Sequence, residues 1–214
     1  MRQVLQHTST FVDKAVIIDD GSTDNSVDTC RECLSGIDLT IIRNDTSRFK
    51  NEVELRKQQW RETLATHPDW ILNIDADELF EDKAVEMLPC LAESVKQEVI
   101  LFRLFDFWTP THYREDRWWR AHLTYRPFMC RYVPSFHYVW KNTPQHCGRF
   151  PSNILDLPYY VSDLRIKHLG WMSEADRIRK YERYKRLDPD AKYGIREQYE
   201  SILDPNPRLV KWVE

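Results

Sequence analysis

Three acidic residues, Asp75, Asp77 and Glu78, directly follow the apolar run of residues 70–74. Such a run is typical of a buried strand, and open α/β sheets bind their ligands at the carboxyl ends of strands. Carboxylates this close repel one another unless a cation neutralises them, so the cluster favours a divalent metal ion with a phosphate-bearing ligand. The alternative is an acidic loop that caps a helix expected over residues 82–93.

A second acidic string, DDGSTD at residues 19–24, follows apolar residues 15–18 and precedes a helical stretch over residues 25–34. Gly21 permits a tight turn, which leaves the side chains of Asp19 and Asp20 free to meet a ligand. Two strands of one sheet that both end in acidic residues converge on one crevice. This arrangement suits a nucleotide with a metal-bound diphosphate, whereas a surface turn with exposed acids is the alternative.

The hydrophobic pattern predicts further elements around these two strings. Strands are expected over residues 39–43, 70–75 and 98–105, and helices over residues 51–66 and 82–93. Strands that alternate with helices in this way indicate parallel pairing with crossover helices. The expected fold class is therefore α/β, with a mostly parallel central sheet flanked by helices.

The pairing of DDGSTD and DADE, each after an apolar strand, resembles the family 2 glycosyltransferases, which have a Rossmann-like GT-A fold. The resemblance covers residues 1–170, with a nucleotide-binding half at 1–104 and an acceptor half at 105–170. Residues 171–214 are expected to form a C-terminal helical extension. The resemblance implies a metal-dependent transfer of a sugar from a nucleoside diphosphate sugar to a hydroxyl group, with inversion. A glycan or lipid-linked acceptor in cell-surface glycan synthesis is expected.

The resemblance also implies roles for individual residues. Asp19 and Asp20 are expected to recognise the nucleobase, and Asp75 the ribose. Asp77 is expected to bind a Mn²⁺ or Mg²⁺ ion that bridges the diphosphate. His168, within the segment KHLGW, resembles a late histidine motif that completes the metal site. A structural histidine is the alternative for His168.

Two arginines lie near the expected nucleotide site. Arg48 is in the connection before the helix expected over residues 51–66, and Arg56 is in its first turns. Either guanidinium has the chemistry to pair with Asp75 or to contact the base. A solvated arginine on a helix surface is the alternative for both.

Transfer to a hydroxyl group requires a base that takes the acceptor proton. The loop of residues 113–118 supplies the first candidate, Asp116, and the second, Glu115, while Asp106 and His146 also remain open. The arginines beside Asp116 and Glu115 make a surface ion-pair loop the alternative. Aromatic side chains crowd residues 105–150, where they either stack on sugar rings of the acceptor or form a subsidiary core.

The N-terminus departs from the family pattern. Family members begin with a strand and a short polar motif, followed by a helix that leads into the DDGSTD strand. Here the chain begins within that helix, whose apolar spacing includes Val4, Leu5 and Phe11. The missing strand is internal in the fold, so its absence is expected to leave a gap with unpaired backbone groups. Either the chain is truncated or its start is misassigned, or the sheet closes differently.

Composition limits the classes of protein to which this chain can belong. The chain has 214 residues, 42% apolar content and a net charge of -3, which argues against a nucleic-acid partner. It shows no signal peptide and no bilayer-spanning run, so a cytoplasmic protein is expected. Its five cysteines are an odd number and favour reduced thiols. The spacing of Cys30 and Cys33 has no second pair beside it, which disfavours zinc.

The last part of the chain predicts a basic helix. Ser173 and Asp176 match a capping box, and the helix continues to Arg186. Its basic residues suit a peripheral contact with the inner face of an anionic membrane, or simply a solvated surface. Two other functions compete with sugar transfer. A nucleotidyltransferase needs a glycine-rich phosphate loop, and no glycine precedes Gly21. A non-catalytic sugar- or nucleotide-binding remnant is favoured by the short N-terminus.

Overall fold

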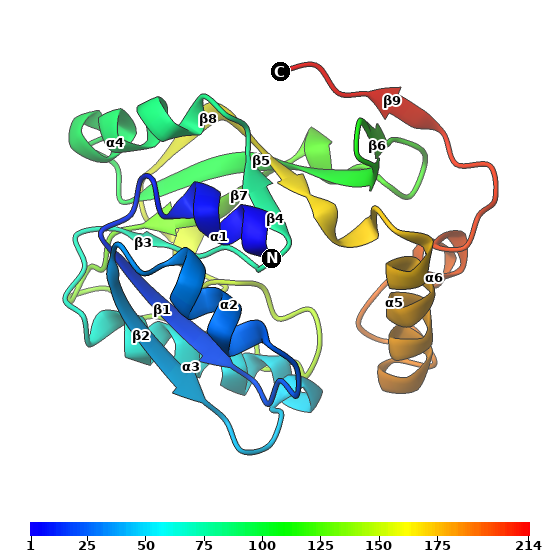
Figure 1. Ribbon diagram of the computed structural model, residues 1–214, viewed down its shortest axis with the longest axis horizontal. Coiled ribbons are helices and arrows are strands. Elements are labelled where there is room, and N and C mark those ends of the chain that lie inside the picture. The colour runs from blue at the N-terminus through cyan, green and yellow to red at the C-terminus, as the bar shows by residue number, and fades with distance from the viewer.

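The computed structural model describes residues 1–214 and contains six α-helices and nine strands (Figure 1). The helices are α1 (Arg2–Thr8), α2 (Ser26–Cys33), α3 (Glu52–Leu64), α4 (Ala84–Ser94), α5 (Glu174–Leu187) and α6 (Arg196–Ser201). The strands are β1 (Lys14–Asp19), β2 (Asp38–Arg43), β3 (Ile71–Leu72), β4 (Glu78–Phe80), β5 (Val99–Thr109), β6 (His112–Arg114), β7 (Tyr125–Cys130), β8 (Tyr159–His168) and β9 (Leu209–Lys211). The fold is α/β, as the hydrophobic pattern predicts.

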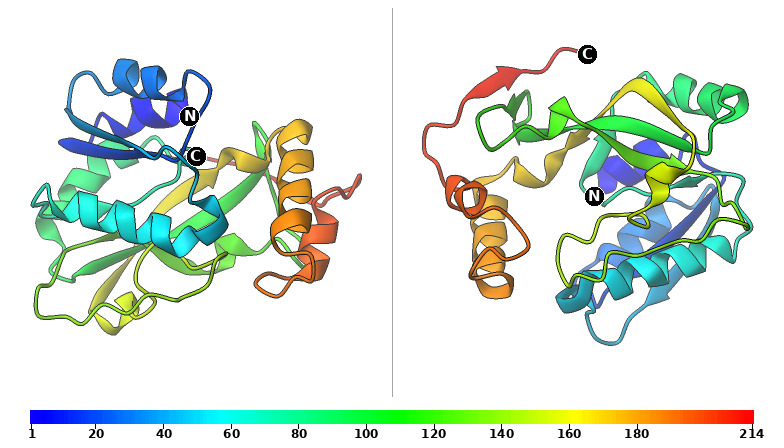
Figure 2. Two further views of the ribbon diagram at one scale, coloured as in Figure 1. Left: turned by 90° about the horizontal axis from the view of Figure 1, so that it is seen from below. Right: turned by 180° about the vertical axis from the view of Figure 1, so that it is seen from behind.

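Strands β1 and β2 form a two-stranded parallel sheet of their own. Alternate side chains of β1, Ala15 and Ile17, pack with Leu5 of α1 and with Cys30 and Leu34 of α2. Helix α3 lies on the opposite face of the two strands, as the front and rear views show (Figures 1 and 2). The alternation of side chains along a strand explains why this small sheet is covered on both faces.

The larger sheet has seven strands built around β5. Strand β5 pairs antiparallel with β7 and parallel with β8, and its later part pairs antiparallel with β6. Strand β3 extends the sheet beside β7, β4 pairs with β8, and β9 pairs with β6. The main core lies between this sheet and α4 and includes Phe80, Leu88, Phe102, Phe128 and Ile166.

The prediction of a mostly parallel sheet is wrong. Only the pairs β1–β2 and β5–β8 are parallel, and the other five pairs are antiparallel. The hydrophobic pattern predicted the strands over residues 39–43, 70–75 and 98–105, which alternate with helices. It did not predict the strands at residues 125–130 and 159–168. Strand β7 pairs antiparallel with β5, whereas β8 pairs parallel with β5 and antiparallel with β4. No α-helix lies between β5 and either strand, so the alternation of strands and helices gives no signal for them.

The C-terminal residues return to the larger sheet. Helices α5 and α6 stand beside the sheets at the right of Figure 1, and the chain then crosses back to form β9. Ile202 packs in a cluster with Trp108, Trp119 and Trp171. These buried tryptophans form a subsidiary core, which was one of the two interpretations of the aromatic crowding. None of the helices is both long and apolar enough to cross a membrane.

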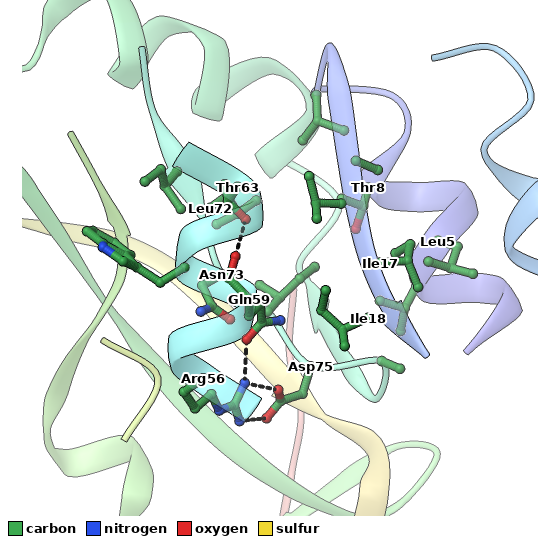
Figure 3. A pocket seen from close by; sticks show the side chains of 18 of the residues that line it. Leu5, Thr8, Ile17, Ile18, Arg56, Gln59, Thr63, Leu72, Asn73 and Asp75 are labelled. Carbon is green, nitrogen blue, oxygen red and sulfur yellow. Dashed lines mark hydrogen bonds and ion pairs between the residues drawn. The ribbon is translucent and has the colours of Figure 1, made fainter. Parts of the chain in front are cut away.

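No strand lies between β1 and β3, and each of them pairs on one side only. The space between them is part of a cavity of about 1400 Å³ that continues to the acidic residues after both strands. Figure 3 shows Ile17 and Ile18 on one side of this space and Leu72 and Asn73 on the other. The gap that the family resemblance implies is therefore present between β1 and β3 in this structure.

Candidate active site

The first acidic string forms a tight turn at the end of β1. Gly21 has a φ of 86°, a left-handed conformation that favours glycine. The carboxylate of Asp19 accepts hydrogen bonds from the Ser22 backbone amide at 3.1 Å and from Arg43 Nε at 3.0 Å. The hydrogen bond with Ser22, together with Arg43, lowers the pKa of Asp19 despite its burial. Asp19 is therefore ionised and held in place.

Asp20 anchors the connection between β2 and α3. Its carboxylate accepts hydrogen bonds from Asn44 Nδ2 at 2.8 Å, from Ser47 Oγ at 2.7 Å and from the Arg48 backbone amide at 2.9 Å. Burial opposes ionisation, but these hydrogen bonds outweigh it and lower the pKa of Asp20. Both Asp19 and Asp20 line the large cavity.

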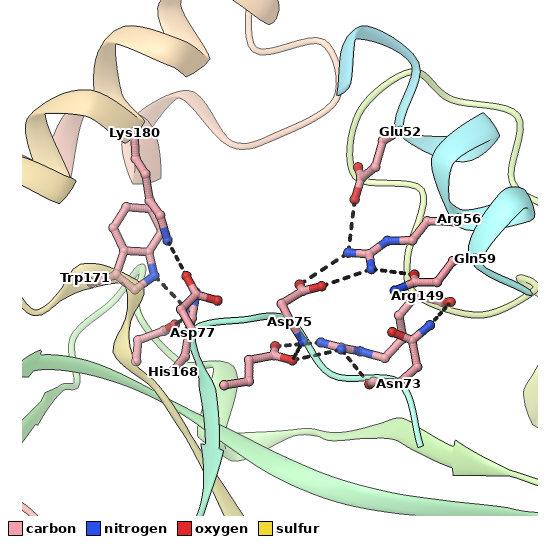
Figure 4. Close-up of polar contacts among 12 residues, drawn as sticks. Glu52, Arg56, Gln59, Asn73, Asp75, Asp77, Arg149, His168, Trp171 and Lys180 are labelled. Atoms are coloured by element: carbon pink, nitrogen blue, oxygen red, sulfur yellow. Dashed lines mark hydrogen bonds and ion pairs between the residues drawn. The ribbon is translucent and has the colours of Figure 1, made fainter. Parts of the chain in front are cut away.

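Asp75 forms a bidentate ion pair with Arg56 of α3. The guanidinium nitrogens Nη1 and Nη2 lie 3.0 and 3.2 Å from the two carboxylate oxygens. Burial raises the pKa of Asp75, but Arg56 and Arg149 outweigh that effect and lower it. Glu52 lies 3.6 Å from Arg56 on its other side (Figure 4). Of the two roles weighed for Arg56, pairing with Asp75 is the one that this structure shows.

Glu78 supports the loop that carries Asp75 and Asp77. Its side chain is only 3% exposed, and both of its oxygens accept hydrogen bonds from Arg149, at 2.7 and 2.9 Å. One of those oxygens also accepts the Asp75 backbone amide at 2.7 Å. Arg149 in addition donates to the Asn73 carbonyl at 2.9 Å. This buried pair fixes the backbone on either side of Asp75.

Asp77 meets two nitrogen groups from distant parts of the chain. His168 Nε2 is 3.5 Å and Lys180 Nζ is 3.3 Å from Asp77 Oδ2 (Figure 4). Burial opposes ionisation of Asp77, but His168 and Lys180 lower its pKa. On the other side of the ring, His168 Nδ1 lies 2.8 Å from Asp106. Burial disfavours the imidazolium, yet Asp106 and Asp77 raise the pKa of His168 to about 9.

Asp77 and His168 are residue types that bind metal ions, but by themselves they supply at most two ligands. The structure contains no group of three or more histidine, cysteine or carboxylate side chains arranged for a metal. Asp77 and His168 nevertheless supply an oxygen and a nitrogen that face each other. Mg²⁺ ions commonly use one or two protein ligands together with substrate phosphates and water. Lys180 shares this position and gives it a fixed positive charge.

His146 lies on another wall of the same cavity, where it begins a hydrogen-bonded chain through Tyr199 to Asp188. His146 has a φ of 53°, a left-handed conformation that is uncommon outside glycine. Its Nε2 lies 2.7 Å from the Tyr199 hydroxyl, which donates to Asp188 Oδ2 at 3.0 Å. Burial lowers the pKa of His146, so the neutral ring predominates at neutral pH. The segment is tied to α3 by the Glu52 amide, which donates to the Pro144 carbonyl at 2.9 Å.

Two of the predicted base candidates lie elsewhere. Asp116 Oδ2 accepts from Arg114 Nε at 2.5 Å, and its Oδ1 accepts the Trp118 amide. Glu115 Oε2 lies 2.9 Å from His122 Nε2. Both carboxylates line a separate small depression, not the cavity that contains Asp75 and Asp77. The arrangement therefore does not support Asp116 or Glu115 as the base, because their carboxylates are held in ion pairs away from the site.

The structure also places Arg48 and the basic residues of α5 differently from what the sequence predicts. The backbone amide of Arg48 binds Asp20, but its side chain does not line the cavity. Several cavity residues escaped the sequence reasoning because they come from α5: Lys180, Arg183 and Tyr184. The only signal for them in the sequence is the basic character of that helix, which suits a membrane contact or a solvated surface. Lys180 and Arg183 instead face the cavity.

The fold and site together define an α/β protein of GT-A-like fold whose acidic strand ends share one cavity. Comparison with known proteins identifies the family. The model of glycosyl transferase family 2 matches residues 3–148, and the chain belongs to that family.

Solved structures show the same fold. A crystal structure of TarS from S. aureus aligns with a TM-score of 0.53 and 12% sequence identity, covering 94% of this chain and 39% of TarS. Among curated proteins, an uncharacterized protein from Mycobacterium tuberculosis and one from Mycobacterium bovis are each 26% identical over 207 residues. Those alignments cover 93% of this chain, which spans about half the length of either relative.

Proposed function

We propose that this protein transfers a sugar from a nucleoside diphosphate sugar to a hydroxyl group of a glycan or lipid-linked acceptor used in cell-surface glycan synthesis. The observation that carries the proposal is the convergence of Asp19, Asp20, Asp75 and Asp77 on one cavity. Membership of glycosyl transferase family 2 supports the donor class and the expectation of inversion.

The nucleoside part of the donor is assigned to the end of the cavity nearest β1. Asp19 and Asp20 lie there with their carboxylates already ionised, and Asp75 follows β3. Asp75 keeps 42% of its side chain exposed although Arg56 binds it. The exposed part has the acceptor oxygens that ribose hydroxyl groups require.

The diphosphate is assigned to the neighbourhood of Asp77. Asp77 and His168 would hold a Mn²⁺ or Mg²⁺ ion there, and such an ion stabilises charge on a diphosphate leaving group. Lys180 already places an ammonium group 3.3 Å from Asp77. Arg183 lines the same cavity one turn further along α5. Both side chains have the charge needed to attract a diphosphate.

His146 is the candidate base that the geometry favours. The single hydroxyl hydrogen of Tyr199 is directed to the carboxylate of Asp188, so His146 Nε2 must donate to the Tyr199 oxygen. The Nδ1 atom of the neutral ring is then unprotonated, and it accepts no hydrogen bond within the protein. A neutral imidazole with a free nitrogen can take the proton of an attacking hydroxyl group. Asp106, the other open candidate, is instead bound to His168.

The first experiment tests donor binding and turnover together. Thermal unfolding is measured with a panel of nucleoside diphosphate sugars, with and without Mn²⁺, and release of the nucleoside diphosphate is then followed. Asp77→Asn keeps the side-chain shape and is expected to reduce turnover by about a hundredfold or more, because it removes a charged ligand. Asp163→Asn changes an exposed aspartate outside the cavity and is the matched control.

A second experiment addresses the base. His146→Gln is expected to slow transfer by about 10²-fold or more while donor affinity stays unchanged. Equal transfer rates in the variant and the parent protein would remove His146 from the mechanism. An unchanged melting temperature with every nucleotide would overturn the donor assignment itself.

The open space between β1 and β3 favours one alternative function. A non-catalytic remnant with this gap beside its donor site would bind a sugar nucleotide without transferring the sugar. Metal-dependent stabilisation by one nucleotide sugar, with neither hydrolysis nor transfer by the parent protein, identifies that alternative. If the parent protein turns over its donor and Asp77→Asn abolishes that turnover, the non-catalytic alternative is excluded.

A further inference from the structure

The ammonium group of Lys180 has two partners of different kinds. Lys180 Nζ lies 3.3 Å from Asp77 Oδ2, and it also lies 4.3 Å from the centre of the Trp171 ring, whose face attracts cations (Figure 4). Only 17% of the lysine side chain is exposed. No other carboxylate lies within ion-pair distance of it, so Asp77 alone neutralises this cation.

Gly170 makes room for the contact between Lys180 and Asp77. A β-carbon at position 170 would overlap both Asp77 Oδ2 and Lys180 Nζ, and it would lie 3.0 Å from His168 Nε2. Any larger residue would therefore push the lysine and the aspartate away from each other. Three polar groups from distant parts of the chain thus converge above a single glycine.

Helix α5, which carries Lys180, is docked firmly on the rest of the fold. Arg177 Nη1 donates to the carbonyls of Trp108 at 3.3 Å and Trp171 at 2.7 Å. The ring of Tyr181 packs against the same buried tryptophan cluster. The helix therefore keeps its place, and only the flexible four-carbon stem of the lysine can carry the ammonium group to another partner.

An ammonium group and a divalent cation cannot share one carboxylate. At a separation of about 4 Å their repulsion is several times the thermal energy even in water, and it is larger in a partly buried site. A cation that binds Asp77 would leave Lys180 without its counter-charge, and an unpaired charge that is mostly buried is unfavourable. The lysine then needs another anion within its reach. The diphosphate assigned to this position would supply a negative charge on each of its phosphates.

We propose that Lys180 couples metal binding to donor binding. Its ammonium group pairs with Asp77 until the diphosphate of the donor arrives with its metal ion, and then passes to the phosphate oxygens. Binding of the metal ion without the donor is weak, because the ammonium group is displaced and gains no new partner. This inference rests on the proposed sugar transfer and on its metal site at Asp77, and it gives a physical reason why metal and donor bind together.

The test compares Mn²⁺ binding by the parent protein and by Lys180→Met, with equilibrium dialysis as the measurement. Methionine keeps an unbranched side chain and removes the charge. Without any phosphate ligand, Lys180→Met should bind Mn²⁺ at least about tenfold more tightly than the parent, because the competing cation is gone. In inorganic diphosphate at a concentration that saturates both proteins, this difference should fall to about twofold or less, because the lysine of the parent has moved to the phosphates.

Three variants control for location and packing. Lys185→Met removes the same charge from an exposed position of α5 outside the cavity and should leave Mn²⁺ binding unchanged. Lys180→Arg keeps the charge and should bind Mn²⁺ as weakly as the parent, which separates the charge of the residue from its packing on Trp171. Adding Asp77→Asn to Lys180→Met should abolish the gain, which locates the ion at Asp77.

Two results would overturn this inference and leave sugar transfer untouched. Equal Mn²⁺ affinities of the parent and Lys180→Met without diphosphate would show that the ammonium group does not compete at Asp77. An equal gain for Lys180→Met with and without diphosphate would show that Lys180 is a fixed charge that does not move. Failure of both proteins to bind Mn²⁺ under either condition is a different result, since it would overturn the metal site of the proposed function and this inference with it.

Discussion

Replacing Arg149 with methionine is expected to destabilise the fold by about 3–5 kcal/mol, because it removes one partner of a buried ion pair. Glu78 is only 3% exposed and Arg149 only 14%, so water cannot easily replace the lost hydrogen bonds. The variant also loses the contact from Arg149 to the Asn73 carbonyl. Because Glu78 accepts the Asp75 amide, we also expect weaker donor binding from a displaced Asp75 loop.

Urea unfolding of Arg149→Met, with the slope compared with that of the parent protein, measures this loss. The double variant Arg149→Met/Glu78→Gln should be more stable than the single variant, because the unpaired buried charge is gone. Arg208→Met is the matched control, since Arg208 is 70% exposed and its pair with Glu115 is expected to contribute about 1 kcal/mol or less. A loss below about 1 kcal/mol for Arg149→Met, or no recovery in the double variant, would refute the reasoning.

Three further predictions concern charge and exposure. His168 has a folded pKa raised to about 9, so its protonated form contributes about 3 kcal/mol of stability below pH 6.5, and this is lost as pH rises through 9. The parent protein should have a higher melting temperature than His168→Gln, measured in the presence of a chelator, and this difference should shrink as the pH rises over that range. A difference in melting temperature that stays constant with pH would contradict the prediction. Lys180→Met should weaken nucleoside diphosphate binding by about tenfold and reduce its salt dependence in calorimetry. An unchanged salt dependence would remove Lys180 from the diphosphate site. Burial raises the pKa of Cys130 to about 12, so iodoacetamide near neutral pH should label exposed Cys90 first, and equal labelling by mass spectrometry would contradict the buried position of Cys130.

The two acidic strings could be located from the sequence because both are local features. Each follows a short apolar strand, and the spacing within each string is set by a few consecutive residues. The same local logic predicted α2, α3 and α4, whereas the gap beside β1 was implied by the family resemblance. Local patterns did not predict the pairing in the larger sheet, because the direction of pairing depends on which distant strand lies beside each strand in the folded chain. Hydrophobic alternation indicates a strand without indicating its partner.

The sequence by itself therefore determined the α/β class, the family and the carboxylates at the ends of β1 and β3. Only the tertiary structure decided which groups surround them. Asp77 meets Lys180 across 103 residues, and Glu78 meets Arg149 across 71. No spacing rule connects such pairs, because their separation along the chain reflects the path of the whole fold and not the geometry of one strand or helix. For the same reason His146, and not Asp116, lines the cavity: the loop tied to α3 is brought to the site, while the acidic loop after β6 is turned away from it.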